Sequence, residues 1–159
     1  MVAFLLGCFD PSERDFNPVL ASVRIEPATG VLGDTLECIA EAADRDGDDP
    51  VVNFAWTNAS TGLALGSGAT YTITRPQAEA GNLLQCNVSA SDADRGLAVT
   101  GLATAEVLNS PPSLAVEVTP AEGRVGDRFE CRADAADPDG DTPTVAYAWS
   151  VAGTEVGTD

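Results

Sequence analysis

Residues 35–56 read TLECIAEAADRDGDDPVVNFAW, and the same plan returns at residues 128–149 as RFECRADAADPDGDTPTVAYAW. The two stretches lie 93 residues apart, and the gap-free alignment extends over residues 18–66 and 111–159. Nearly half of the aligned positions are identical, which chance does not produce. The chain is therefore a tandem array with a period near 93 residues.

Period-two alternation of apolar side chains runs through both copies. In the first copy, Leu36, Cys38 and Ala40 fall on one face of a strand, and Phe54 and Trp56 share a face of the next. Turn residues separate the alternating runs, as in all-β domains. The expected strands are residues 19–25, 35–42, 51–57, 70–74, 83–89 and 98–108, and one short helix is expected at residues 75–80.

The chain resembles the tandem immunoglobulin-like and PKD-like repeats of bacterial surface proteins. The residues that carry the resemblance are Asn109–Pro112, Pro120, Gly126 with Asp127, Cys131, Asp137–Asp141 and Tyr147–Trp149. The resemblance implies an all-β, immunoglobulin-like Greek-key β-sandwich, with one complete copy and the N-terminal half of a second in tandem. We expect a leader and tether at residues 1–17, a complete sandwich at 18–109 and an incomplete repeat at 110–159.

The resemblance also implies a disulfide bond. In immunoglobulin-like sandwiches a tryptophan between two cysteines in sequence packs on the bond that joins the sheets, and Cys38, Trp56 and Cys86 follow that order. Two buried free thiols are the alternative. By the same period, Cys131 would pair with a cysteine near position 179 of a longer protein, of which we expect this chain to be a part.

The N-terminal residues point to a lipid anchor. Leu5-Leu6-Gly7-Cys8 resembles a bacterial lipobox, in which a signal peptide is removed before a cysteine that then carries lipid. The alternative is a stray apolar segment with a free thiol at Cys8. The lipobox predicts a cell-surface protein, an outer-membrane lipoprotein, that contacts a membrane through this anchor alone.

Aspartates cluster in the turns between strands, and we expect them to bind calcium. Calcium prefers several oxygen ligands from flexible loops, and alternating aspartates around a glycine supply them. Solvated acidic turns are the alternative, because aspartate and glycine favour turns for local reasons. The candidate ligands are Asp44, Asp46, Asp48, Asp92, Asp94, Asp137, Asp139 and Asp141.

Composition argues against several functions. The 25 acidic residues outnumber 8 basic ones, which gives a net charge of −17 and disfavours nucleic acid as a partner. Histidine, the commonest general base, is absent from the sequence. No glycine-rich phosphate loop precedes a helix. We therefore expect a protein that is not an enzyme.

The function expected is that of an extracellular structural stalk, whose stacked repeats contact one another and are stiffened by calcium. A module that adheres to surface glycans or proteins is one alternative. An accessory spacer of a secreted enzyme, whose catalytic domain lies beyond residue 159, is another. The apolar face of the second copy is expected to lack an opposing sheet.

Overall fold

The computed structural model describes residues 16–45, 47, 49–92 and 98–158. The chain divides into two units, Met1–Leu108 and Asn109–Asp159. All regular structure in the described residues is β-strand. Across those same residues, no helix is long and apolar enough to cross a membrane. The helix expected at residues 75–80 is wrong: the chain turns there, with one bond from the amide of Ala78 to the carbonyl of Thr74 and no continuation.

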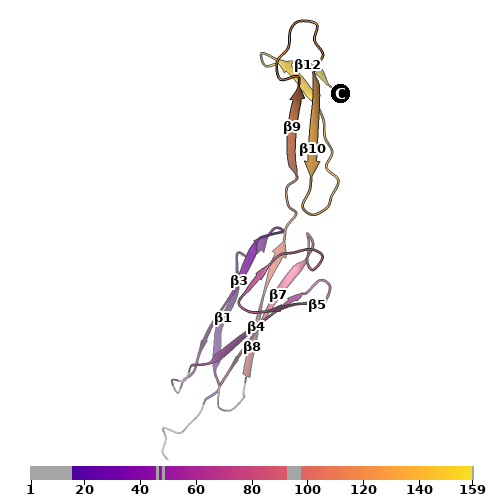
Figure 1. Cartoon of the computed structure of the whole chain (residues 1–159). Helices are drawn as coiled ribbons and strands as arrows, with labels where there is room; N and C mark the ends of the chain where they lie inside the picture. The colour runs from indigo at the N-terminus through magenta and orange to yellow at the C-terminus, as the bar shows by residue number, and fades with distance from the viewer. Residues whose placement is uncertain (1–15, 46, 48, 93–97, 159) are drawn as a thin grey trace, which may run out of the picture. The chain divides into compact units, whose positions relative to one another are not determined.

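Unit 1 consists of two sheets, consistent with a β-sandwich (Figure 1). One sheet has the order β1-β3-β6 and the other β2-β8-β7-β4-β5. Neighbouring strands are antiparallel, except for the short parallel pair β2 and β8. The strands are β1 (Val19–Glu26), β2 (Thr29–Gly30), β3 (Thr35–Ala43), β4 (Val51–Asn58), β5 (Leu63–Ser67), β6 (Thr70–Thr72), β7 (Leu83–Ser91) and β8 (Ala98–Val107).

The core of unit 1 forms because the alternating strands turn their apolar faces toward each other. In β7 the side chains of Leu84, Cys86 and Val88 are buried, while the residues between them are partly exposed. Leu36 of β3 is fully buried as well. Gly101 lets β1 approach β8 closely, since a Cβ added there would lie 2.6 Å from Cδ2 of Leu20.

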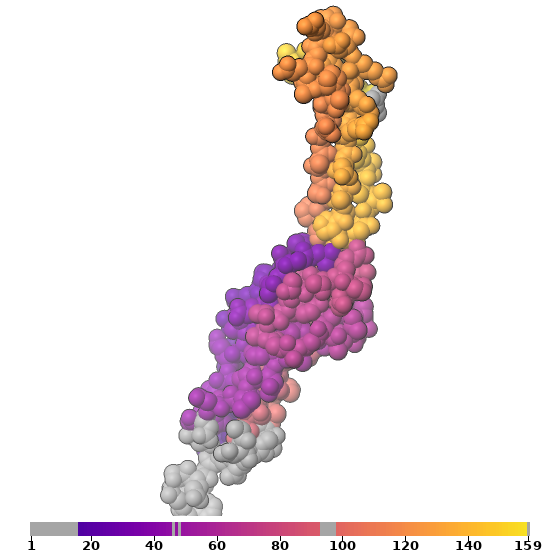
Figure 2. Space-filling model, viewed as in Figure 1, coloured from indigo at the N-terminus to yellow at the C-terminus, as the bar shows by residue number. Residues whose placement is uncertain are grey.

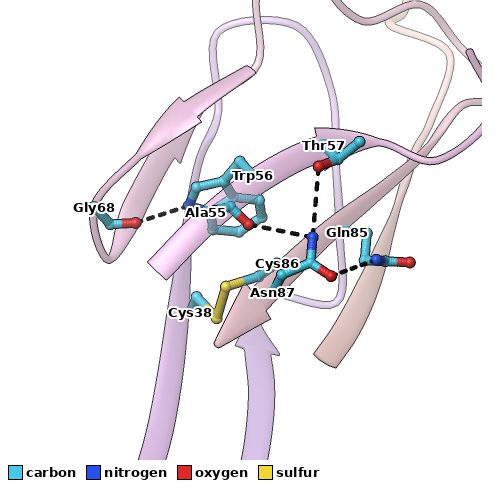
Figure 3. The surroundings of a disulfide bond; sticks show 8 residues. All are labelled: Cys38, Ala55, Trp56, Thr57, Gly68, Gln85, Cys86 and Asn87. Atoms are coloured by element: carbon cyan, nitrogen blue, oxygen red, sulfur yellow. Dashed lines mark hydrogen bonds between the residues drawn. A yellow bond between two sulfur atoms is a disulfide. The ribbon is translucent and has the colours of Figure 1, made fainter. Parts of the chain in front are cut away.

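A disulfide bond between Cys38 of β3 and Cys86 of β7 joins the two sheets (Figure 3). The two Cα atoms are 6.3 Å apart, within the usual range for such bonds. Trp56 lies beside the bond with 1% of its surface exposed, and its Nε1 donates a 3.0 Å hydrogen bond to the carbonyl of Gly68. Tyr71 packs against Trp56, with ring centroids 5.8 Å apart. The expected pairing of Cys38 with Cys86 is confirmed.

Unit 2 has two separate two-stranded sheets. β9 (Ser113–Thr119) pairs with β10 (Glu130–Ala136), and β11 (Ala148–Val151) forms a hairpin with β12 (Thr154–Thr158). Between β10 and β11 the chain runs alongside β10 (Figures 1 and 2). As expected, the apolar face of this unit is open: Leu114 and Val116 of β9 are each 60% exposed.

Removing the inter-sheet bond should weaken unit 1 strongly. The bond closes a loop with a sequence separation of 48 residues, so its loss should cost about 4 kcal/mol of unfolding free energy through the entropy of the unfolded chain. The measurement is denaturant unfolding of the double variant Cys38→Ala/Cys86→Ala, followed by tryptophan fluorescence. Cys131→Ala is the matched control, and an equal loss in that variant would contradict the assignment.

Candidate functional site

The acidic loops of unit 1 leave the five-stranded sheet at the same end. Val51, the first residue of β4, pairs with Ser91, the last residue of β7, so the turn before β4 and the turn after β7 are neighbours. Asp44 and Asp92 lie in these turns, whereas Asp46, Asp48 and Asp94 fall outside the described residues. In the part of the chain that is described, no three acidic or cysteine side chains are grouped to hold a metal ion.

The acidic loop of unit 2 uses its carboxylates to hold backbone amides. One carboxylate oxygen of Asp137 accepts a 2.8 Å hydrogen bond from the amide of Asp139. The carboxylate of Asp139 in turn accepts a hydrogen bond from the amide of Ser110, at the start of the unit. Both carboxylates are half-buried and hold backbone amides of unit 2, so Asp137 and Asp139 have structural roles there. Asp141 is exposed and lies in the same loop.

An aspartate-capped turn occurs in both units at equivalent positions. In unit 1, Oδ2 of Asp34 accepts a 2.9 Å hydrogen bond from the amide of Val31. The amide of Asp34 in turn donates a 3.1 Å hydrogen bond to the carbonyl of Val31. In unit 2, Asp127 and Arg124 make the same two bonds at 2.7 and 3.0 Å. The residue before each aspartate is a glycine with positive φ, which side chains disfavour. The turn is a structural device that both units share.

The best-defined polar site of unit 1 is centred on Asn58, at the end of β4. Asn58 is fully buried, and its Nδ2 donates to the carbonyl of Gln77 at 2.9 Å and to Oδ1 of Asn82 at 2.7 Å. Its Oδ1 accepts from the amides of Ser60 and Thr61 at 3.0 and 3.2 Å. Asn58 thus ties the β4–β5 turn to the segment that precedes β7.

Sequence reasoning missed this site. Its partners are two turn amides close by, the backbone carbonyl of Gln77, 19 residues away, and the side chain of Asn82, 24 residues away, so no local pattern marks them. The only available sign was the position itself. Asn58 follows Trp56 on the buried side of β4, where an asparagine needs several partners.

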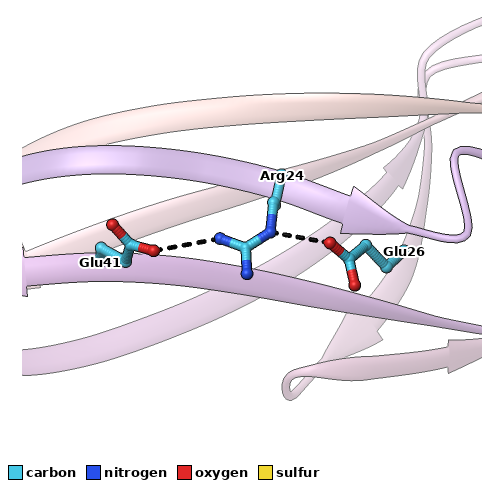
Figure 4. A network of polar contacts seen from close by, with 3 residues as sticks. All are labelled: Arg24, Glu26 and Glu41. Carbon is cyan, nitrogen blue, oxygen red and sulfur yellow. Dashed lines mark hydrogen bonds and ion pairs between the residues drawn. The ribbon is translucent and has the colours of Figure 1, made fainter.

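The outer face of the three-stranded sheet carries ion pairs. Arg24 lies between two glutamates, with Nε 2.9 Å from Glu26 and one terminal nitrogen 3.3 Å from Glu41 (Figure 4). The hydrogen bond to Glu26 is the main reason why the pKa of Arg24 is raised above its ordinary value. All three groups are well exposed, so the network contributes little to stability.

The outer face of the five-stranded sheet, by contrast, carries no charged residue around Asn87, and Glu106 lies farther along β8. On this face Oδ1 of Asn87 accepts a 2.6 Å hydrogen bond from Nε2 of Gln85, and Nδ2 of Asn87 donates to Oγ1 of Thr57 at 3.5 Å (Figure 3). A shallow hollow of about 630 Å³ opens beside it. Its lining residues include Asn53, Ala55, Asn87, Ser89, Thr100 and Leu102. We define these six residues as the amide face.

Two predicted sites involve cysteines. Cys8, the expected lipid-bearing residue, lies outside the described residues. Cys131 is a half-buried free thiol on β10.

No family model, no curated protein and no solved structure matches this chain. The sequence and the geometry above are therefore the basis for proposing a function.

Loss of the Asn58 side chain should destabilise unit 1. In Asn58→Ala the carbonyl of Gln77 and two turn amides lose their buried partner, at a cost of about 1–3 kcal/mol. Asn58→Asp also destabilises unit 1, because it places a buried carboxylate opposite the carbonyl of Gln77 and Oδ1 of Asn82, but it keeps the acceptor, so its turn amides should stay protected in the folded protein. Amide hydrogen exchange at Ser60 and Thr61 separates the two variants, and equal exchange in both would contradict the assigned roles.

Proposed function

We propose that this chain is a non-catalytic structural module of an extracellular bacterial surface protein, built from immunoglobulin-like repeats in tandem. The observation that carries the proposal is that both units use one local plan at positions 93 residues apart. A unit that repeats with constant length suits a stalk, because each copy adds the same increment of length.

The shared plan includes strand register. Cys38 pairs with Ile25 between β3 and β1, and Cys131 pairs with Val118 between β10 and β9. Both members of the second pair lie 93 residues after the first. In each unit a β-bulge directly follows the tryptophan, Trp56 in one and Trp149 in the other. The aspartate-capped turn is the third common element, and together the three support tandem copies.

The disulfide supports an extracellular location. Bonds of this kind persist in oxidising compartments and are rare where thiols are kept reduced. The order cysteine, tryptophan, cysteine across two sheets is typical of immunoglobulin-like domains. Anchoring of the chain through lipid on Cys8 completes the proposal, since it would fix one end of the array at the membrane.

A second candidate function is adhesion through the amide face. Uncharged amides and hydroxyls can form hydrogen bonds with sugar hydroxyls or with another protein, and this face interrupts a surface that is strongly acidic elsewhere. It lacks exposed aromatic rings among its six residues, which favours the stalk. A role as spacer of a secreted enzyme is compatible with the same geometry.

A stalk must bear tension, and single-molecule stretching tests this. With the disulfide intact, the 48 residues after Cys38 cannot extend when unit 1 unfolds. Reduction, or the variant Cys38→Ala/Cys86→Ala, should therefore lengthen the unfolding step by about 170 Å, at roughly 3.6 Å per residue. Cys131→Ala should leave the step unchanged. If the oxidised unit 1 extends without a resolved force peak, the stalk function is excluded.

Calcium stiffening makes a separate prediction. Added calcium should raise the melting temperature of the chain, because a cation relieves repulsion among the loop carboxylates. Asp44→Asn combined with Asp92→Asn should reduce that increase. Glu37→Gln combined with Glu106→Gln removes the same charge from exposed strand positions and should not. Calorimetric titration that detects no heat, together with an unchanged melting temperature, would remove calcium from the proposal.

A further inference from the structure

The open face of unit 2 is a groove with a cysteine in it. A cavity of about 300 Å³ lies between the β9–β10 pair and the segment that enters β11. The lining residues that matter here are Val116, Val118, Cys131, Ala133, Tyr147 and Trp149. The lining residues carry no charged side chain, and Val118 remains 41% exposed. In the described part of unit 2, no strand covers this face.

Unit 1 shows what covers the equivalent face there. Ile25, the counterpart of Val118, is only 5% exposed. The covering element is β7, which runs antiparallel to β4 with Cys86 opposite Trp56. Its inward side chains fill the space between the sheets, and Cys86 bonds to Cys38, the counterpart of Cys131.

We propose that the groove of unit 2 binds a β-strand that carries a cysteine between alternating apolar residues and bonds to Cys131. The strand would run antiparallel to β11, with its cysteine opposite Trp149, as Cys86 lies opposite Trp56. β7 itself is not the occupant, because it is buried in unit 1 and its cysteine is already bonded. The inference rests on the groove and on the comparison of the two units, independently of the stalk function.

The pattern of the occupant follows from β7. Counted from the cysteine, positions −2, +2 and +4 should be apolar, as Leu84, Val88 and Ala90 are. Those three side chains face the core, whereas Gln85 and Asn87 between them are polar. An edge strand with unpaired backbone groups accepts such a segment by adding a strand to its sheet. β11 pairs with β12 alone among the described strands, so its other edge is available.

The bond would form by thiol–disulfide exchange. The strand's cysteine enters as a mixed disulfide with a small thiol, and the thiolate of Cys131 attacks the strand's sulfur. A sulfur–sulfur bond to Cys131 forms while the bond to the small thiol breaks. The small thiol leaves with the electron pair and takes up the proton that Cys131 released, so no further oxidant is needed.

The test uses the intact chain and a synthetic peptide, LLQCNVSAS, which copies residues 83–91 and carries glutathione on its cysteine. The matched control peptide has the same composition, with Leu84 and Gln85 exchanged and Asn87 and Val88 exchanged, so that its polar side chains would face the groove. The first peptide should bond to Cys131 at least tenfold faster than the control. It should also slow amide exchange in β11 while unit 1 stays unchanged.

Cys131→Ser separates binding from bonding. This variant should form no crosslink, yet it should still show slowed exchange in β11 with the first peptide and not with the control. Equal reaction rates of the two peptides without protection of β11 would overturn the proposal. So would a disulfide-linked dimer through Cys131, or a bond between Cys131 and Cys8, formed in preference to the peptide adduct.

Discussion

The closure of two sheets on the Cys38–Cys86 bond is the constraint on which unit 1 depends. Each sheet alone has an apolar face that water would contact, and strands that are not packed on another layer are only marginally stable. The bond fixes β3 opposite β7, and Trp56 fills the space beside it with almost no exposed surface. Every strand that pairs with β3 or β7 is thereby placed relative to the same core.

This arrangement divides the surface into two kinds of face. The three-stranded sheet presents ionised side chains around Arg24, and the five-stranded sheet presents the uncharged amide face. A net charge of −17 keeps such a chain soluble, but an uncharged area offers a partner contact without the cost of stripping water from ions. The adhesion we propose as a second function would use the amide face, whereas the proposed stalk rests on the repeat and on the disulfide.

Much of the fold follows from sequence because its signals are periodic. The six strands expected in unit 1 are all present, with ends that differ by one or two residues, and the pairing of Cys38 with Cys86 is confirmed. β5 was missed because Leu63–Ser67 has no buried alternation, and β2 has only two residues. The Asn58 site was missed because tertiary contacts create it, and those leave no local pattern. The open face of β9 and β10 was expected from the repeat, while the groove required coordinates.

Asn58 also distinguishes the two units from each other. The residue 93 positions later is Val151, which has no amide to offer, and the hairpin there closes through a tight turn at Ala152 and Gly153. Neighbouring repeats with similar strands risk exchanging them while they fold. If β11 took the place of β4, the buried carbonyl of Gln77 would be left without its partner, at a cost of about 1–3 kcal/mol. The asparagine thus gives the correct strand arrangement a lower free energy than the exchanged one, and it favours correct folding in a chain whose repeats are otherwise much alike.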